Sequence, residues 1–186
     1  MVVSMQILKP IVTALLIALP GTSPAQDQGG AVDDLLQRLL DADPVDAKKI
    51  ERELDLVWRR SGSPSMDLLM TRGQDAMEAG EVGTAIGHFS ALIDHAPSFA
   101  EAWHRRAQAF YRQEEFGLAV ADLGQTLSLN PNHFNAIYGL GVIFESLDKP
   151  DQAFELYSRV LELYPTHERA IEAQERLQGK ITGQTL

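Results

Sequence analysis

Three prolines recur at a fixed interval and constrain the fold of the chain more strongly than any other feature. Pro97, Pro131 and Pro165 lie 34 residues apart. Five other positions of this period hold residues of matching size, with Ala76 as the one weak member: Gly73, Ala107 and Gly141; Ala85, Ala119 and Ala153; Phe89, Leu123 and Tyr157; Leu69, Trp103 and Ile137; and Ala76, Phe110 and Phe144. A period of this length indicates stacked supersecondary units, and about three of them bury a continuous core.

Each unit has the apolar pattern of two helices joined by a short turn. Trp103, Ala107 and Phe110 share one helical face, and Ala119 and Leu123 belong to a second apolar stripe. The small residues predict where the two helices of a unit come closest, and the large residues fill the space around them. The proline at the end of each unit stops the second helix, because proline lacks the N–H that the helical hydrogen-bond ladder needs.

Two stretches, "AEAWHRRAQAFYRQEEFGLAVADLGQTLSLNP" (100–131) and "FNAIYGLGVIFESLDKPDQAFELYSRVLELYP" (134–165), carry a family resemblance. They resemble the tetratricopeptide repeat, whose unit has a tryptophan-like position, a small residue, an aromatic residue, then alanine, a second aromatic residue and proline. The stretch 66–97 departs at Ala76, where the family has an aromatic residue, so looser packing against the preceding segment is expected. The resemblance covers residues 66–165 and implies a right-handed, all-α solenoid of helical hairpins.

The domain organisation follows from this period. Residues 65–166 hold the three units, with bounds at 66–99, 100–133 and 134–167, and residues 168–178 form a C-terminal capping helix before a flexible tail at 179–186. Residues 26–64 form an N-terminal helical hairpin that caps the solenoid. This hairpin is not a fourth repeat, because Leu40 and Arg52 occupy its small positions. Val57 or Trp58 is expected to pack on the first unit.

The N-terminus has the layout of a secretory signal peptide over residues 1–25. Lys9 precedes the apolar run 11–19, and Pro20 and Gly21 close it. The small residues two apart at the end, the second of which is Ala25, predict cleavage after Ala25. The run is too short to cross a bilayer core of about 30 Å as a helix. We therefore expect the chain to be exported to a periplasm and to have no stable membrane insertion after cleavage. The alternative is an uncleaved segment that tethers the chain to the membrane.

Composition and motifs exclude several classes of function. The net charge of −10 is expected to repel nucleic acid, and the lack of cysteine excludes thiol nucleophiles and cysteine-ligated zinc. The five histidines, His88, His95, His104, His133 and His167, form no H-E-x-x-H pattern or other ligand cluster, so structural or solvated roles are expected. The chain has no phosphate-binding glycine loop and no G-x-S-x-G motif. We therefore predict no enzyme activity, no cofactor and no metal.

The remaining candidate is a binding surface on the concave side of the solenoid, which first helices line. The resemblance places these exposed positions at Met70, Gln74, Met77, His104, Arg105, Gln108, Tyr111, Arg112, Tyr138, Val142 and Glu145. Arg105, Arg112, Tyr111 and Tyr138 are expected at its centre, where a basic stripe in an acidic chain favours an acidic or carboxylate-bearing partner segment. Arg106 is expected to turn towards a neighbouring helix instead.

Some family members hold the C-terminal carboxylate of a partner with lysine, asparagine and arginine on their first helices. The matching places here include Met70, Gln74, Arg105, Asn135 and Gly139, of which only Arg105 and Asn135 could serve. That specificity is therefore not predicted. The sequence favours a non-enzymatic protein-interaction module or adaptor of a bacterial cell envelope. The alternatives are a self-associating structural scaffold and a regulatory subunit of an envelope enzyme.

Overall fold

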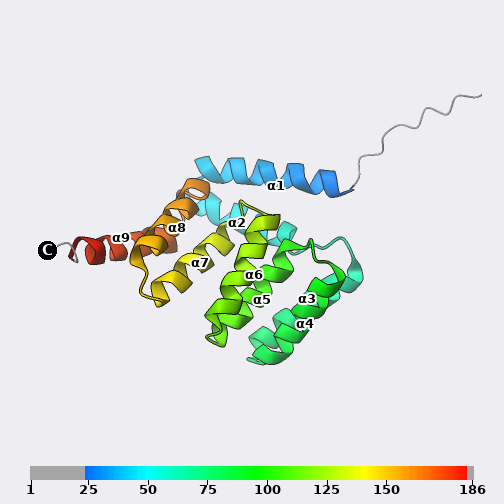
Figure 1. The fold of residues 1–186 in the computed structure, drawn as a ribbon. Coiled ribbons are helices and arrows are strands. Elements are labelled where there is room, and N and C mark those ends of the chain that lie inside the picture. Colours follow the sequence, from blue (N-terminus) through cyan, green and yellow to red (C-terminus); the bar gives the residue numbers. More distant parts are fainter. Residues whose placement is uncertain (1–23, 184–186) are drawn as a thin grey trace, which may run out of the picture.

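A computed structural model describes residues 24–183, and this part of the chain is all-α, as the sequence predicts (Figure 1). Side chains are described for residues 30–179. Nine helices make up this part, with no strand: α1 (Pro24–Asp41), α2 (Pro44–Trp58), α3 (Pro64–Glu78), α4 (Val82–His95), α5 (Ala100–Arg112), α6 (Phe116–Leu129), α7 (Phe134–Ser146), α8 (Pro150–Leu163) and α9 (Glu168–Gly183).

The three 34-residue units correspond to the helix pairs α3–α4, α5–α6 and α7–α8, which lie side by side in Figure 1. The capping helix α9 packs on α8, as expected, but it continues to Gly183. The sequence predicts that this helix ends at residue 178 and that a flexible tail follows at 179–186, whereas the structure continues the helix through residues 179–183.

The signal-peptide region lies outside the described residues, except for Pro24 and Ala25, which begin α1. Among the helices of residues 24–183, none combines the length and the apolar character needed to span a membrane. Cleavage after Ala25 stays a prediction.

The small positions of the repeat are sites of close helix approach, as predicted. A Cβ atom built on Gly141 of α7 would lie 2.6 Å from Cε1 of Tyr157 on α8. A Cβ atom built on Gly73 of α3 would lie even closer to Cε1 of Phe89 on α4. Tyr157 and Phe89 are buried, and each ring occupies the space that a side chain at the small position would need. In the first and third units, the 34-residue period thus places a glycine against a buried aromatic ring.

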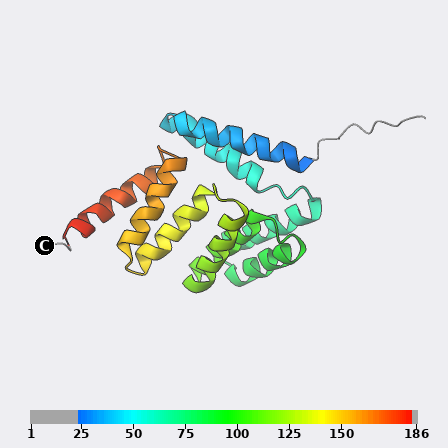
Figure 2. The same cartoon turned by 45° about the horizontal axis from the view of Figure 1, so that its top comes forward.

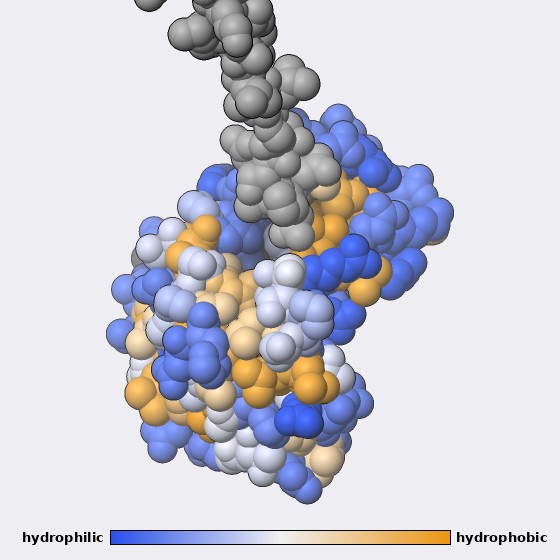
Figure 3. Space-filling view, turned by 90° about the vertical axis from the view of Figure 1, so that its right-hand side faces the viewer, coloured by the Kyte–Doolittle hydropathy of each residue, from blue (hydrophilic) through white to orange (hydrophobic). Residues whose placement is uncertain are grey.

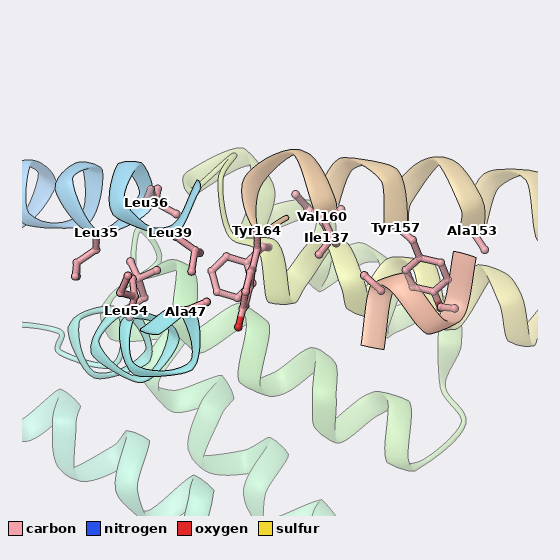
Figure 4. Close-up of a cluster of buried hydrophobic side chains, with 14 of the residues drawn as sticks. Leu35, Leu36, Leu39, Ala47, Leu54, Ile137, Ala153, Tyr157, Val160 and Tyr164 are labelled. Atoms are coloured by element: carbon pink, nitrogen blue, oxygen red, sulfur yellow. The ribbon is translucent and has the colours of Figure 1, made fainter. Parts of the chain in front are cut away.

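The N-terminal hairpin packs in a different place from the one expected. In Figure 2, α1 and α2 cross the solenoid beside α7 and α8. The buried leucines of the hairpin join the apolar cluster of α7, α8 and α9, and Figure 4 shows Leu39 beside Tyr164. The buried residues of the first unit form a separate cluster.

Trp58 shows the same correction at one residue. Its ring stacks on His133 at a centroid distance of 4.3 Å and lies 5.2 Å from Phe134, so it packs at the start of the third unit and not on the first. The hairpin therefore covers the third unit and α9.

The outer face of the first unit carries apolar residues with hydrophilic residues around them, which Figure 3 shows from that side.

We expect Gly141→Leu to lower the free energy of unfolding by about 1–3 kcal/mol, because the added side chain must displace the buried Tyr157 ring. The better helix propensity of leucine returns at most about 1 kcal/mol. Gly124→Leu is the matched control, because Gly124 lies in α6 with no atom within 4 Å of an added Cβ. Urea denaturation of both variants measures the difference. Equal midpoints would contradict the assigned close approach.

Candidate functional site

A groove of about 540 Å³ lies on the concave side of the solenoid, between the first helices of the three units, α2 and the start of α9. Eight of the residues predicted for the partner surface line it: Met77, His104, Arg105, Gln108, Tyr111, Arg112, Tyr138 and Val142. Of these, His104 is only 3% exposed, so its expected exposure was wrong. Helical spacing brings them together, since residues three or four apart share a face of α5 or α7. The groove is the strongest candidate for a functional site in the described part of the chain.

The other three predicted residues do not line the groove. Met70 is only 2% exposed and belongs to the core of the first unit, so its expected place on the surface was wrong. Gln74 is half-buried on the same helix. Glu145 points towards α9, where its carboxylate accepts hydrogen bonds from Arg176 at 2.8 and 3.0 Å and from the Tyr157 hydroxyl.

Arg105 lines the groove but is not free to grip a partner. Its Nε donates to Oε1 of Glu101, and its Nη2 donates to Oδ1 of Asp55 on α2 at 2.7 Å. Asp55 also forms an ion pair with Arg59, at 3.2 Å. Contrary to the expectation from the sequence, Arg105 is therefore not available to bind an acidic partner segment, because two carboxylates of the chain itself neutralise its guanidinium.

Glu101 is a fully buried carboxylate at the start of α5. Burial alone would raise its pKa, but the His104 ring and the Arg105 guanidinium beside it hold the pKa well below the usual range. Oε2 of Glu101 also contacts Nε2 of His133 at 2.8 Å and Nδ1 of His104 at 3.3 Å. Burial lowers the pKa of His104, so its ring is neutral at pH 7. Arg105 is then the cation that balances Glu101.

Glu101, His104 and His133 place three potential metal ligands within 4.8 Å of one another, which the sequence analysis did not anticipate. The hydrogen bonds nevertheless oppose a metal. Nδ1 of His133 accepts the backbone N–H of Ala136 at 3.2 Å, so Nε2 of His133 carries the proton and donates it to Glu101. A metal ligand would need a lone pair at that nitrogen. The donor set fits a closed hydrogen-bond network instead.

His167 repeats this arrangement one unit later. Its Nδ1 accepts the backbone N–H of Ala170 at 3.1 Å, as His133 does for Ala136, and the two histidines are 34 residues apart. Burial lowers the pKa of His167 to about 4, so the ring stays neutral at pH 7. Its ring lies 5.1 Å from that of Tyr138, which it supports from below the groove. The structural roles expected for His133 and His167 agree with these contacts.

Arg106 turns away from the groove, as predicted. Its Nε and Nη2 donate to the carboxylate of Asp122 on α6 at 2.7 and 2.9 Å, and its guanidinium lies over the Trp103 ring at 5.0 Å. This pair joins the two helices of the second unit.

Two arginines at the groove keep free charge. Nη1 of Arg112 donates to the backbone oxygen of Met77 at 2.7 Å, and the Arg169 guanidinium lies 4.8 Å from the centroid of the Tyr138 ring. Within the part of the chain that the structure describes, neither arginine forms an ion pair with a carboxylate. Sequence reasoning missed Arg169, because it belongs to the capping helix and reaches the groove only through the stacking of α9 on α8.

Comparison with known proteins agrees with this architecture. The tetratricopeptide repeat family model matches residues 70–125 and 104–168, and the chain belongs to that family. A TPR repeat-containing protein of Rhizobium etli is 29% identical over 82% of this chain and 75% of its own length. The small glutamine-rich tetratricopeptide repeat-containing protein 2 of Saccharomyces cerevisiae is 28% identical over 70% of this chain, which spans only 37% of that relative.

Solved structures share the fold. The first TPR domain of Spaghetti (RPAP3), bound to the HSP90 peptide SRMEEVD, superposes with a TM-score of 0.61 at 25% identity and covers 63% of this chain and 93% of its own. MamA superposes with a TM-score of 0.59 at 20% identity over 86% of each chain. Tetratricopeptide repeats are generally non-enzymatic modules that mediate protein–protein interaction, and the first of these neighbours holds a peptide.

We expect Arg105→Met to lower the free energy of unfolding by about 1–3 kcal/mol at pH 7, because Glu101 then remains buried without its cation. The pKa of Glu101 is lower in the folded chain than in the unfolded chain, where it is near 4.5. Ionised Glu101 therefore stabilises the fold at pH values above 4.5, and this stabilisation is lost as the pH falls further. The gap between wild type and variant should therefore narrow below pH 4.5.

Arg112→Met is the control, because Arg112 is exposed and has no carboxylate partner among the described residues. Guanidinium denaturation from pH 3 to 8 measures both variants. A gap that does not change with pH would show that Arg105 acts through its packing and not through the charge of Glu101.

Proposed function

We propose that the chain is an exported adaptor of a bacterial cell envelope, and that it binds a segment of a partner protein in the concave groove. The observation that carries this proposal is the groove of about 540 Å³, which residues from all three units and from α9 line together. Tyrosine and arginine, the side chains that dominate many protein interfaces, are prominent in it. Family membership supports the protein-interaction part of this proposal.

The groove suits a peptide segment better than a small metabolite. Tyr111 is 38% exposed, and Tyr138, Val142 and Met77 are half-buried along the same surface. These side chains give a partner apolar contact area, while Gln108 and Asn135 offer hydrogen bonds. Asp55, His104 and Arg105 of the groove lie in satisfied hydrogen-bond networks, which supports binding over catalysis.

Export is the second part of the proposal and rests on residues 1–25. The apolar run, its Pro20–Gly21 end and the small Ser23 and Ala25 support cleavage after Ala25. N-terminal sequencing of the chain recovered from its native host is expected to begin at Gln26. A chain that retains Lys9 in the membrane fraction would favour the tethered alternative.

Photo-crosslinking in cells tests the binding site. We expect benzoylphenylalanine in place of Tyr111 to crosslink a partner protein, because Tyr111 lines the groove. The same photoreactive residue in place of Leu118 is the control, since Leu118 is 49% exposed on α6 outside the groove. Equal crosslinking from both positions, or none from Tyr111, would count against the groove. Crosslinks only to a second copy of this chain would favour the self-associating scaffold.

A further inference from the structure

The hairpin takes up one half of the concave face. Asp55 of α2 binds Arg105, Trp58 stacks on His133, and Glu51 accepts a hydrogen bond from the Tyr164 hydroxyl. These contacts reach the second turn of α5, the N-cap of α7 and the C-cap of α8. The open groove therefore runs along the later turns of the first helices, past Tyr111 and Val142.

Helix α2 is a fixed wall of this groove and not a loosely held lid. Six apolar side chains of the hairpin are at most 7% exposed: Leu35, Leu36, Leu39, Ala47, Ile50 and Leu54. They share one cluster with Phe134, Tyr164 and Ala170 of the third unit and α9. Withdrawal of the hairpin would expose this whole cluster to water, which the hydrophobic effect opposes. A partner must therefore fit beside α2.

The open groove holds two arginines without a carboxylate partner against the single carboxylate of Glu51. Asp55 is paired with Arg105 and Arg59, whereas Glu51 keeps its negative charge, because the Tyr164 hydroxyl that donates to it is neutral. Arg112 and Arg169 line the same groove and have no carboxylate partner among the described residues. The chain carries a net charge of −10, so this pair of exposed arginines is a local exception in an acidic molecule.

We propose, on the basis of the function proposed above, that the open half-groove recognises a partner segment that carries carboxylates on both sides of an apolar residue. Arg112 at the end of α5 and Arg169 at the start of α9 bind the carboxylates, and Tyr111, Tyr138 and Val142 contact the apolar residue. Arginine suits this role because its guanidinium forms two parallel hydrogen bonds with one carboxylate.

The residues proposed here differ from those at the positions where some family members hold a C-terminal carboxylate. At those positions Met70 is buried, Gly139 has no side chain, and Arg105 is already neutralised. The specificity of this chain comes instead from the last turn of one first helix and from the capping helix. Since both arginines are exposed, binding should weaken at high salt.

A phage-displayed library of random dodecapeptides, selected on the full chain, tests the proposal. We expect the selected peptides to be rich in Asp and Glu around apolar residues. A synthetic copy of the best one is then titrated by fluorescence anisotropy against Arg112→Ser with Arg169→Ser. We expect this double variant to lose about 100-fold in affinity, at about tenfold for each charged hydrogen bond removed.

Arg52→Ser with Arg72→Ser is the matched control. It removes two exposed arginines that do not line the groove, and it should change the affinity by less than about threefold. Selected peptides without an excess of acidic residues, or an equal loss in both double variants, would overturn the acidic specificity while the groove keeps its role as a peptide site. If the library yields no binder at all, the proposed function fails with it.

Hydrogen exchange separates a fixed wall from a lid. We expect the amides of α2 to be equally protected in the free chain and in the complex with the selected peptide, because the hairpin stays in place. Loss of protection in α2 on binding would show that the peptide displaces the hairpin. The proposal that the peptide binds beside α2 would then be wrong.

Discussion

The buried carboxylate of Glu101 connects the separate parts of this molecule. An isolated charge in a protein interior is costly, so Glu101 must have a cation and hydrogen-bond donors. Arg105 supplies the cation from the same helix, and His133 supplies a donor from the start of the third unit. Because Arg105 also binds Asp55, this one charge joins α2 to the second and third units. The hairpin is thereby seated on the concave side.

The position of the hairpin decides what the concave face can do. A bare solenoid would offer the whole length of its first helices, whereas here α2 covers their early turns. Arg105, the residue that sequence reasoning placed at the centre of a docking site, becomes a structural residue. Among the described residues that line the remaining groove, the arginines without a carboxylate partner are Arg112 and Arg169. The fold thus keeps an open concave groove but makes it narrower than in a solenoid without the hairpin.

Much of the solenoid could be predicted because its decisive contacts lie within one unit. Gly141 meets Tyr157 only 16 residues away, and a 34-residue period repeats that contact in register. Arg106 could be placed for the same reason, since helical phase alone turns it towards α6. Eight of the predicted surface residues line the groove because the position on a first helix also fixes the direction of the side chain. Met70 fails because the first unit buries that position in its own core.

The sequence by itself determined the number of units, the helix pairs and the face that each helix buries, because periodic patterns record local geometry. Tertiary structure alone decided where the hairpin packs, which carboxylate neutralises Arg105, and that Arg169 reaches the groove. Asp55 and Arg105 are 50 residues apart, and no periodicity relates them. The apolar stripe of α1 and α2 shows that these helices must be buried, but hydrophobic burial is non-directional and does not specify the surface that they meet. Shape and charge complementarity at the second and third units made that choice, through the Trp58–His133 stack, the Asp55–Arg105 pair and the apolar cluster with Phe134 and Tyr164.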